Sequence, residues 1–530
     1  RAYGSIFARG GATGGNGGFV ETSGKRYLDA TRAADVSAAF GLAGTWLLDP
    51  SGLTIINTGS DLNIPGPSPF QAGVGISTLT ATTINTGLTT GNVAIISDVG
   101  DDIKFDASVS GAIVITNGTG SARVLSLSAG NDIKFTGGST TFQTTAANSP
   151  LTVNFNPATS RKVEVQSGST LTFSGSAASS AVSGVIVGGP GAKTWENQGI
   201  LNMSGESYID LHDGTYYSAF NNTAGGVVNI TSSAGWSFLS ENGTQDGALN
   251  NAGTINVNGT NGGSTNYTAW EVKYNQAPGG VLNIGAGKVL SMQNADVIRG
   301  AVNIGAGGKL ALSQDFTGAH SFINTTINGP GWVDIAGGGA PSFSGVTVNN
   351  ASLVNSAGDL TIPTGIIGTT GDIGLLASGI LWGGAGIASL GKLMLVGGWD
   401  NTSSVTAPTV TSGVGSIQII DAQIQSAGDM TLKSGGDILI KRNLSGSTRV
   451  ESSAVMAVET WGDLTLVNYF DPGGSVELKS AGNQSIQLKG ALSDLVVQAS
   501  AGGAGGGYTR ISSGGTQTIN FTAAGTHTLV

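Results

Sequence analysis

An apolar–asparagine–apolar triplet recurs through the middle of the chain, and it constrains the fold more than any other feature. The five copies are ILNMS, VVNIT, TINVN, VLNIG and AVNIG, with central residues Asn202, Asn229, Asn256, Asn283 and Asn303. The first three intervals are 27 residues each and the fourth is 20. Because side chains alternate along a β-strand, the apolar pair shares one face and the asparagine takes the other.

A repeat of this length, built from short strands and glycine-containing turns, predicts a solenoid. Successive copies would stack as parallel strands about 4.8 Å apart, with the apolar pairs lining a core. The asparagines would form an outward ladder in which each amide bonds to the next. We therefore expect an all-β chain folded as an elongated right-handed parallel β-helix (β-solenoid), with coils of about 20–30 residues.

A second pattern has the form strand, Gly-Asn/Asp turn, strand. GDDIKF begins at Gly100 and GNDIKF at Gly130, and longer echoes cover residues 430–440 and 476–488. In these turns we expect glycine to supply a positive φ and Asn or Asp a local side-chain hydrogen bond. The only helix-like segment is 27–40.

The chain divides by pattern into four stretches. Residues 1–55 form an N-terminal segment joined to the solenoid, and residues 56–180 and 351–530 are solenoid coils without the ladder. Residues 181–350 carry the 27-residue repeat.

Composition excludes several classes of function. The net charge is −10 and only 11% of the residues are charged, so the clustered Lys and Arg that nucleic acid requires are missing. No cysteine is present, which removes disulfides and thiol chemistry. The charge-free run 373–391 contains six glycines, so buried strands explain it better than a membrane span. We expect no nucleic-acid partner and no membrane insertion.

Two groups of side chains invite a ligand or modification hypothesis. Asp98, Asp101, Asp102 and Asp106 offer oxygen ligands for calcium, but known calcium-loop spacing is absent and a solvated turn is favoured. Thirteen Asn-x-Ser/Thr sequons occur, a number close to that expected from composition. The candidates for glycosylation are Asn202, Asn229, Asn242 and Asn266.

Catalysis finds little support in the sequence. His212-Asp213 could be a base and its orienter, but the chain has three histidines and no nucleophile motif. We expect a protein that is not an enzyme, with no catalytic residue, metal or cofactor. The interval STNYTAWEVKYN instead suggests an exposed aromatic loop that contacts a ligand through Tyr267, Trp270 and Tyr274.

The segment GGNGGFVETSG, followed by AGTWLLDPSGLTI, lies within residues 14–55. It resembles a signature of filamentous-haemagglutinin-like exoproteins, most of all the high-molecular-weight adhesins exported by two-partner secretion. From the residues themselves, we expect Phe19 to face the core and Trp46 to Leu48 to form an apolar plug. The chain begins with Arg1, so we expect a piece of a longer precursor.

The resemblance implies a secreted or surface-exposed adhesin at the outer surface of a Gram-negative bacterium. Its partners would be host-cell or surface glycans and proteins, and an outer-membrane two-partner secretion transporter during export. An alternative is a structural subunit that joins copies of itself through the β-helix ends into an extracellular filament or matrix. A carbohydrate-active β-helix enzyme is a distant alternative, because we find no cluster of carboxylates on one face.

Overall fold

The structure is a computed structural model, and it describes most of the 530-residue chain. The described residues are 4–24, 32–50, 52–59, 77–145, 149–174, 182–186, 193–211, 218–233, 235–239, 247–259, 267–294, 296–313, 319–337, 341–363, 371–384, 386–444, 446–469, 473–499 and 507–530. The chain forms two compact units, Arg1–Asn283 and Ile284–Val530. The stretch borders expected at 55, 180 and 350 stay predictions.

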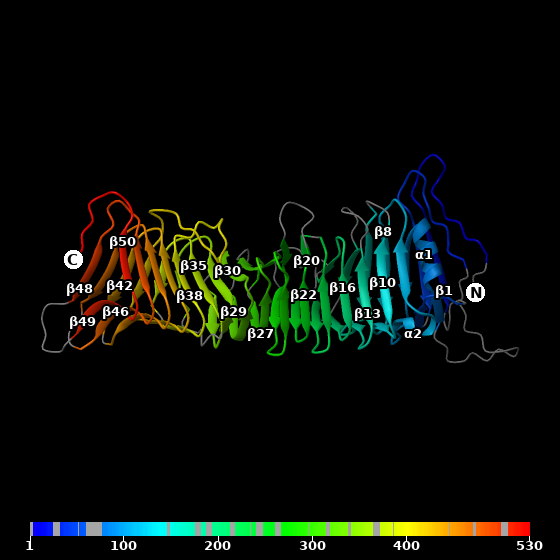
Figure 1. Cartoon of the computed structure of the whole chain (residues 1–530). Helices are drawn as coiled ribbons and strands as arrows, with labels where there is room; N and C mark the ends of the chain where they lie inside the picture. The colour runs from blue at the N-terminus through cyan, green and yellow to red at the C-terminus, as the bar shows by residue number, and fades with distance from the viewer. Residues whose placement is uncertain are drawn as a thin grey trace. The chain divides into compact units, whose positions relative to one another are not determined.

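In the first unit, three rows of parallel strands recur in the same order, coil after coil (Figure 1). Row A contains β1 (Phe19–Gly24), β2 (Thr45–Pro50), β5 (Asn92–Ile96), β8 (Arg123–Ala129), β11 (Leu151–Pro157), β14 (Val182–Ile186), β17 (Tyr208–Asp210), β20 (Trp236–Leu239) and β23 (Tyr267–Trp270). Row B contains β3 (Leu53–Ile56), β6 (Ile103–Asp106), β9 (Ile133–Thr136), β12 (Lys162–Val165), β15 (Lys193–Asn197), β18 (Ser218–Asn222), β21 (Ala248–Asn251) and β24 (Lys273–Gln276), and β4 (Ser77–Thr80) pairs with its strand β3. Row C contains β7 (Ile113–Asn117), β10 (Ser139–Thr144), β13 (Thr170–Ser174), β16 (Ile200–Met203), β19 (Val227–Ile230) and β22 (Thr254–Val257), and β25 (Val281–Ile284) follows at the unit border.

The strand register confirms the repeats. Ile200 pairs with Val227 and Val227 with Thr254, which gives two coils of 27 residues. Ile103 pairs with Ile133, so the copies at Gly100 and Gly130 are stacked in adjacent coils. The echoes at 430–440 and 476–488 share the local form but do not pair with each other. The first begins at β41 (Met430–Ser434), and the second begins at β46 (Ser475–Ser480), in a different row.

Alternate side chains point inward and build the core of each unit. In the first unit its centre is an aromatic stack, in which Phe142 lies 5.7 to 6.1 Å from the rings of Phe105, Phe135, Phe155 and Phe173. All of these rings are at most 1% exposed. Burial of this many large side chains supplies most of the driving force for folding.

The helical segment expected at 27–40 is wrong for its described part, because residues 32–40 contain no helix and pair instead with residues 6–10 through main-chain hydrogen bonds. The described residues contain the short α2 (Ala107–Ser110) and the longer α1 (Ala81–Thr90). The first turn of α1 is capped by the Thr80 hydroxyl. This helix lies beside β7, where the Asn85 amide accepts from Thr116 N–H and donates to the Val114 carbonyl. Thr and Asn have weak helix propensity, so tertiary contacts decide this element.

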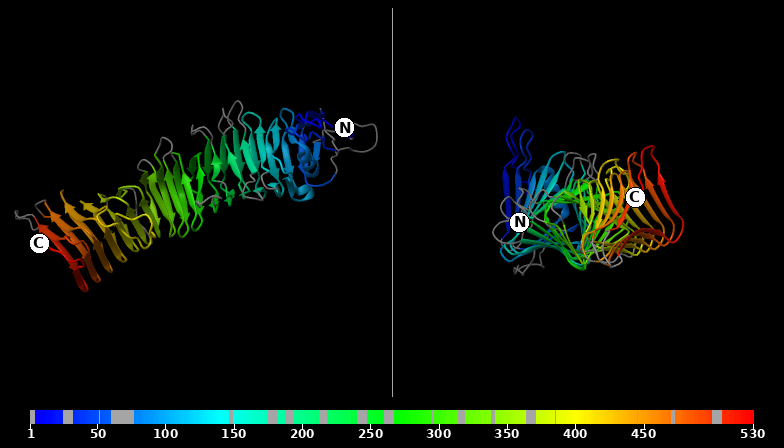
Figure 2. Two further views of the ribbon diagram at one scale, coloured as in Figure 1. Left: turned by 90° about the horizontal axis from the view of Figure 1, so that it is seen from above. Right: turned by 90° about the vertical axis from the view of Figure 1, so that its left-hand side faces the viewer.

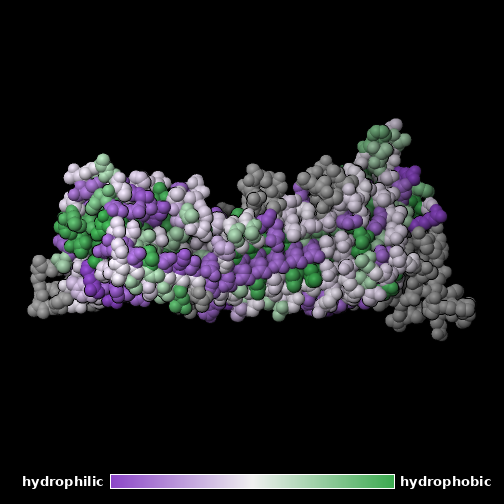
Figure 3. Space-filling view, viewed as in Figure 1, coloured by the Kyte–Doolittle hydropathy of each residue, from purple (hydrophilic) through white to green (hydrophobic). Residues whose placement is uncertain are grey.

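The N-terminal signature is part of the stack. Strand β1 pairs with β2 over the whole of FVETSG and TWLLDP, from Phe19 with Thr45 to Gly24 with Pro50. Trp46 and Leu48 are buried as expected, but Leu47 between them is only partly buried and Phe19 is 63% exposed. The expectation for Phe19 was wrong because Val20, not Phe19, shares the inward face with Trp46. An apolar tip projects from the residues before β1 and β2 (Figure 3).

The second unit contains one long row of parallel strands, row D, and two shorter rows, E and F (Figure 2). Row D contains β26 (Val289–Met292), β28 (Lys309–Ser313), β30 (Trp332–Gly337), β33 (Ala351–Asn355), β35 (Ile373–Ala377), β38 (Leu393–Gly397), β41, β44 (Met456–Thr460), β47 (Gln484–Leu488) and β50 (Gln517–Phe521). Beside its start lie β27 (Val297–Ile304), β29 (Ser321–Asn328), β31 (Ser342–Ser344) and β32 (Thr347–Asn349). Row E follows with β34 (Leu360–Thr361), β36 (Leu381–Gly383), β39 (Ile417–Ile420), β42 (Ile438–Arg442), β45 (Leu464–Asn468) and β48 (Leu495–Ala499), and row F with β37 (Ile387–Ser389), β40 (Gln423–Ser426), β43 (Thr448–Ser452), β46 and β49 (Tyr508–Ser513).

The chain is thus all-β, with rows of parallel strands stacked coil on coil as in a parallel β-helix. The run 373–391 forms buried strands as expected. Within the described residues, no helix has the length and apolar character needed to cross a membrane. The right-handed sense of the coils stays a prediction.

The Gly-Asp turns follow the expectation only in part: Gly100 has the expected positive φ of 91°, but the aspartate hydrogen bonds differ. The Asp437 carboxylate accepts from the main-chain N–H of Asp463 in the next coil, and Asp463 does the same for Asp494. The bond is therefore between coils, not local. Gly462 is required for close approach, since a Cβ there would lie 2.0 Å from Asp437 Oδ1. Gly462 does not have a positive φ, so backbone conformation does not explain the glycine at this position.

Candidate functional site: an outer groove in the second unit

The outer face of row D is apolar along one column of side chains, which is unusual for a solvent-facing sheet. Val354, Leu376 and Val396 all point outward, yet none exposes any surface. They are covered by the segment 398–416, which leaves the sheet after β38 and packs Trp399 and Val405 against the column. Because β35 is buried on both faces, its apolar residues do not alternate with polar ones.

The covering segment is held in one conformation by its own polar groups. Trp399 Nε1 donates to Ser403 Oγ over 3.0 Å, and Asp400 accepts from the main-chain N–H groups of Thr402 and Ser403. Hydrogen bonds from the Ser403 and Thr409 side chains hold the pKa of Asp400 well below its ordinary value. The segment therefore forms a fixed wall above the sheet.

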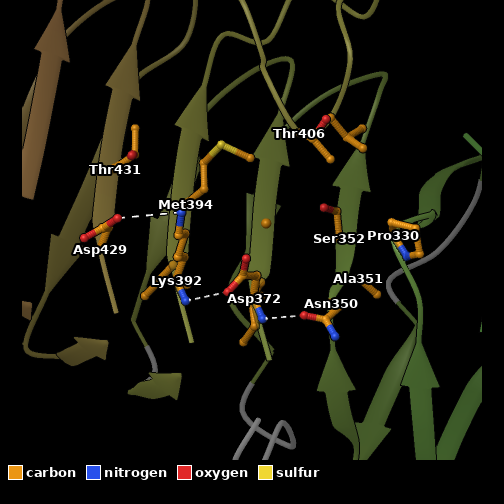
Figure 4. A pocket seen from close by; sticks show the side chains of 14 residues that line it. Pro330, Asn350, Ala351, Ser352, Asp372, Lys392, Met394, Thr406, Asp429 and Thr431 are labelled. Atoms are coloured by element: carbon orange, nitrogen blue, oxygen red, sulfur yellow. Dashed lines mark hydrogen bonds and ion pairs between the residues drawn. The ribbon is translucent and has the colours of Figure 1, made fainter. Parts of the chain in front are cut away.

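Next to this wall lies an open groove of about 560 Å³, which crosses four neighbouring strands of row D (Figure 4). Its floor is the second outward column, with one residue from each of β33, β35, β38 and β41. The lining residues are Pro330, Asn350, Ala351, Ser352, Asp372, Ile373, Gly374, Lys392, Leu393, Met394, Val405, Thr406, Asp429 and Thr431.

The lower edge of the groove is polar and follows the turns that precede these strands. The Asn350 Oδ1 accepts from Asp372 N–H over 3.0 Å, and Asp372 Oδ1 accepts from Lys392 N–H over 2.8 Å. Lys392 Nζ lies 3.7 Å from Asp429 Oδ2. The main chain thus fixes the positions of the Asn350 amide and the Asp372 carboxylate at this edge (Figure 4).

On the floor, Ser352 and Gly374 are the smallest residues. Ser352 is 7% exposed, and its hydroxyl has no hydrogen-bond partner among the described residues. A Cβ at Gly374 would lie 2.5 Å from Ser352 Oγ, so a larger residue there would displace the serine. Met394 and Val405 provide apolar contact area. The groove can accommodate an extended polar molecule that lies across the strands.

The predicted asparagine ladder is confirmed from Asn202 to Asn283, and its step from Asn283 to Asn303 stays a prediction. In the first unit, Asn229 donates to Asn202, Asn256 to Asn229 and Asn283 to Asn256, over 2.7 to 2.8 Å. In the second unit, Asn303 accepts from Asn328 over 2.9 Å. The ladder of the first unit contributes to a hydrophilic band across β16 to β22 (Figure 3). These amides order the surface and leave fewer donors for a ligand.

The glycosylation and calcium hypotheses gain no support. The Asn202 and Asn229 amides are engaged in the ladder, and Asn242 and Asn266 lie outside the described residues. Asp102 forms an ion pair with Lys134 over 2.6 Å and Asp106 with Lys104 over 2.7 Å.

In the described part of the chain, no three His, Asp or Glu side chains, those of Asp98 and Asp101 included, are placed to hold a metal ion.

The ligand-contact hypothesis is wrong for two of its three aromatic residues. Trp270 and Tyr274 expose no surface and belong to the core, where their ring centroids lie 5.0 Å apart. Trp270 Nε1 donates to Ser237, and the Tyr274 hydroxyl donates to Gln276. Both residues lie on strands, β23 and β24, with their side chains on the inward face. The polar residues around them in the sequence had suggested a loop instead. The side chain of Tyr267 and residue His212 lie outside the described set.

Sequence reasoning missed the groove. The available signal was the uninterrupted apolar strand 373–377, which indicates cover on both faces, and the 32 residues between β38 and β41, which include the covering segment. No protein-family model and no curated protein matches the chain.

Proposed function

We propose that the chain is an adhesin-like exoprotein, secreted by or exposed on a Gram-negative bacterium, that attaches to cells, surfaces or glycans by binding and not by catalysis. The observation that carries the proposal is the N-terminal signature: its two characteristic strands are stacked in register as β1 on β2, at the start of the coils. This stacking supports the proposal, because the resemblance implies a signature that is continuous with the solenoid.

Further observations support this proposal. Outward side chains of the coils are mainly Asn, Ser and Thr, which remain hydrated and suit a surface-exposed protein. A stack in which each coil contacts only its neighbours can form progressively as a chain leaves a transporter. The absence of cysteine removes any disulfide from that process. A two-partner secretion transporter in the outer membrane is the export partner we propose.

The test is attachment by the purified 530-residue chain. Fluorescent beads coated with the folded chain are applied to epithelial cells and to immobilised glycans, beside beads coated with the heat-denatured chain. We expect saturable attachment that soluble folded chain competes away. Equal attachment by folded and denatured chain would refute the proposal. Antibody labelling of intact producing cells and of the culture medium tests the location.

A filament subunit is the second candidate, and the last strands favour it. β49 pairs only with β46 and β50 only with β47 among the described strands, so one edge of each has no partner. Ile519 on β50 is 39% exposed, whereas its partner Ile486 is buried. Such an edge can accept strands of another copy. Light scattering over a concentration series distinguishes the two: growth in mass with concentration supports assembly, and constant monomer mass excludes it.

A further inference from the structure

We propose that the outer groove of row D binds an uncharged oligosaccharide, laid across β33, β35, β38 and β41. This inference rests on the proposed attachment function and names the ligand class of one site. Nothing in the N-terminal signature points to this groove, which lies entirely within the second unit.

The dimensions suit a short oligosaccharide. Four parallel strands about 4.8 Å apart give a floor on the order of 14 Å long. The wall formed by 398–416 closes one long side, and the turn residues close the other. An extended peptide gains most of its affinity from main-chain bonds to a strand edge, and the groove exposes a sheet face instead. Polar side chains spaced along a shallow trough match the repeated hydroxyls of a sugar chain.

The polar groups offer both donors and acceptors to such hydroxyls. Ser352 as a residue is 7% exposed, and its hydroxyl makes no hydrogen bond within the described structure and lines the groove. Asn350 uses its Oδ1 for the main chain of Asp372, and its Nδ2 makes no hydrogen bond within the described structure. Asp372 is fixed in the same way through Lys392 N–H. Fixed groups lose little entropy when they bind a ligand.

Charge decides which sugars are accepted. The groove holds two carboxylates, Asp372 and Asp429, against a single ammonium group, Lys392, which already lies near Asp429. The whole chain carries a net charge of −10. A sialylated or sulfated sugar would therefore meet an excess of negative charge, while a neutral sugar would not. Met394 and Val405 supply the apolar contacts for the C–H faces of the rings.

The test uses the full chain and an array of neutral oligosaccharides together with their sialylated and sulfated counterparts. Neutral binders are then titrated by calorimetry against Thr431→Trp, which fills the groove from the solvent side of β41. Thr518→Trp is the matched control, since Thr518 is an exposed outward residue of β50 in the same row. We expect T431W to weaken binding at least about tenfold and T518W to leave it unchanged.

A second variant tests the charge argument without disturbing the turn. Asp372→Asn keeps an Oδ1 acceptor for Lys392 N–H and removes the negative charge. We expect D372N to reduce the preference for neutral over sialylated probes.

The inference is overturned if sialylated probes bind the wild-type chain best, or if T431W binds like T518W. If beads coated with T431W still attach to cells, the groove is not the attachment site and the adhesin proposal stands. If the groove binds neutral probes but the beads attach to no surface, the adhesin proposal fails and the inference of an oligosaccharide site in the groove stands.

Discussion

A column of buried amides runs between rows B and C of the first unit, parallel to the outward ladder. Asn197 donates to Asn222 and Asn222 to Asn251, each over 2.8 Å, and all three residues are at most 1% exposed. Each Nδ2 also donates to a main-chain carbonyl beyond the turn, as Asn222 does to Thr254. Buried amides bonded in this way satisfy main-chain groups that the turn would leave without partners.

Asn222→Ala should therefore cost more than Asn229→Ala, although both residues are asparagines in 27-residue coils. The first substitution leaves buried partners on two sides, and we expect it to lower the free energy of unfolding by about 2–5 kcal/mol. The second removes two ladder bonds, to Asn202 and from Asn256, but these half-buried amides can bond to water instead, so we expect a loss of about 1 kcal/mol. Thermal and denaturant melting of both variants provide the comparison. Equal losses would mean that the buried column adds nothing beyond the ladder.

The carboxyl group of Glu477 makes the stability of the C-terminal coils depend on pH. Burial raises the pKa of this carboxyl, but hydrogen bonds from Tyr508, Arg510 and Ser475 and the charge of Arg449 outweigh it, so the pKa lies below the ordinary 4.5. A lowered carboxyl pKa stabilises the fold above about pH 4.5, and the contribution is lost as the pH falls through the folded-state value.

Glu477→Gln should therefore be less stable than the wild type at pH 7, by about 3 kcal/mol, because two guanidinium groups lose their carboxylate. Below pH 4.5 the difference in melting temperature should shrink. Glu451→Gln is the control on the same face; its carboxylate is 24% exposed, and we expect a smaller difference. A difference for E477Q that does not change between pH 7 and pH 3 would contradict the assignment.

At the scale of elements, the turns between strands set the spacing of coils. Gly462→Ala would place a Cβ 2.0 Å from Asp437 Oδ1 and break the Asp437–Asp463 bond. We expect a loss of about 1–3 kcal/mol, as for other overpacked sites. Gly384→Ala is the control, since a Cβ there meets nothing within 4 Å. Melting curves of the two variants should separate clearly, and coincident curves would show that the coils can shift apart at little cost.

The elements also show what the sequence could and could not reveal. Strand positions followed from period 2 and from repeats, so the stacking of Ile103 on Ile133 and of Asn202 on Asn229 could be predicted. Helix α1 could not, because its threonines favour strands and contacts with β7 and other neighbouring strands make it helical. The groove could not be predicted either, since it depends on where the segment 398–416 packs, and no local pattern encodes that position.

At the scale of the whole molecule, each coil is supported mainly by its two neighbours, and this makes stability local. Phe142 lies in the middle of the aromatic stack of the first unit and exposes no surface. Phe142→Ala should remove about 3–5 kcal/mol of stabilisation at that point. In hydrogen exchange with mass spectrometry, we expect faster exchange in β7, β10 and β13 and little change in β21 and β24 of the same unit. Leu249→Ala on β21 is the reciprocal control, since Leu249 is also fully buried and should shift the effect to its own coils. Uniformly faster exchange in both variants would instead show that the unit unfolds as a single cooperative body, and the nearest-neighbour description would have to be abandoned.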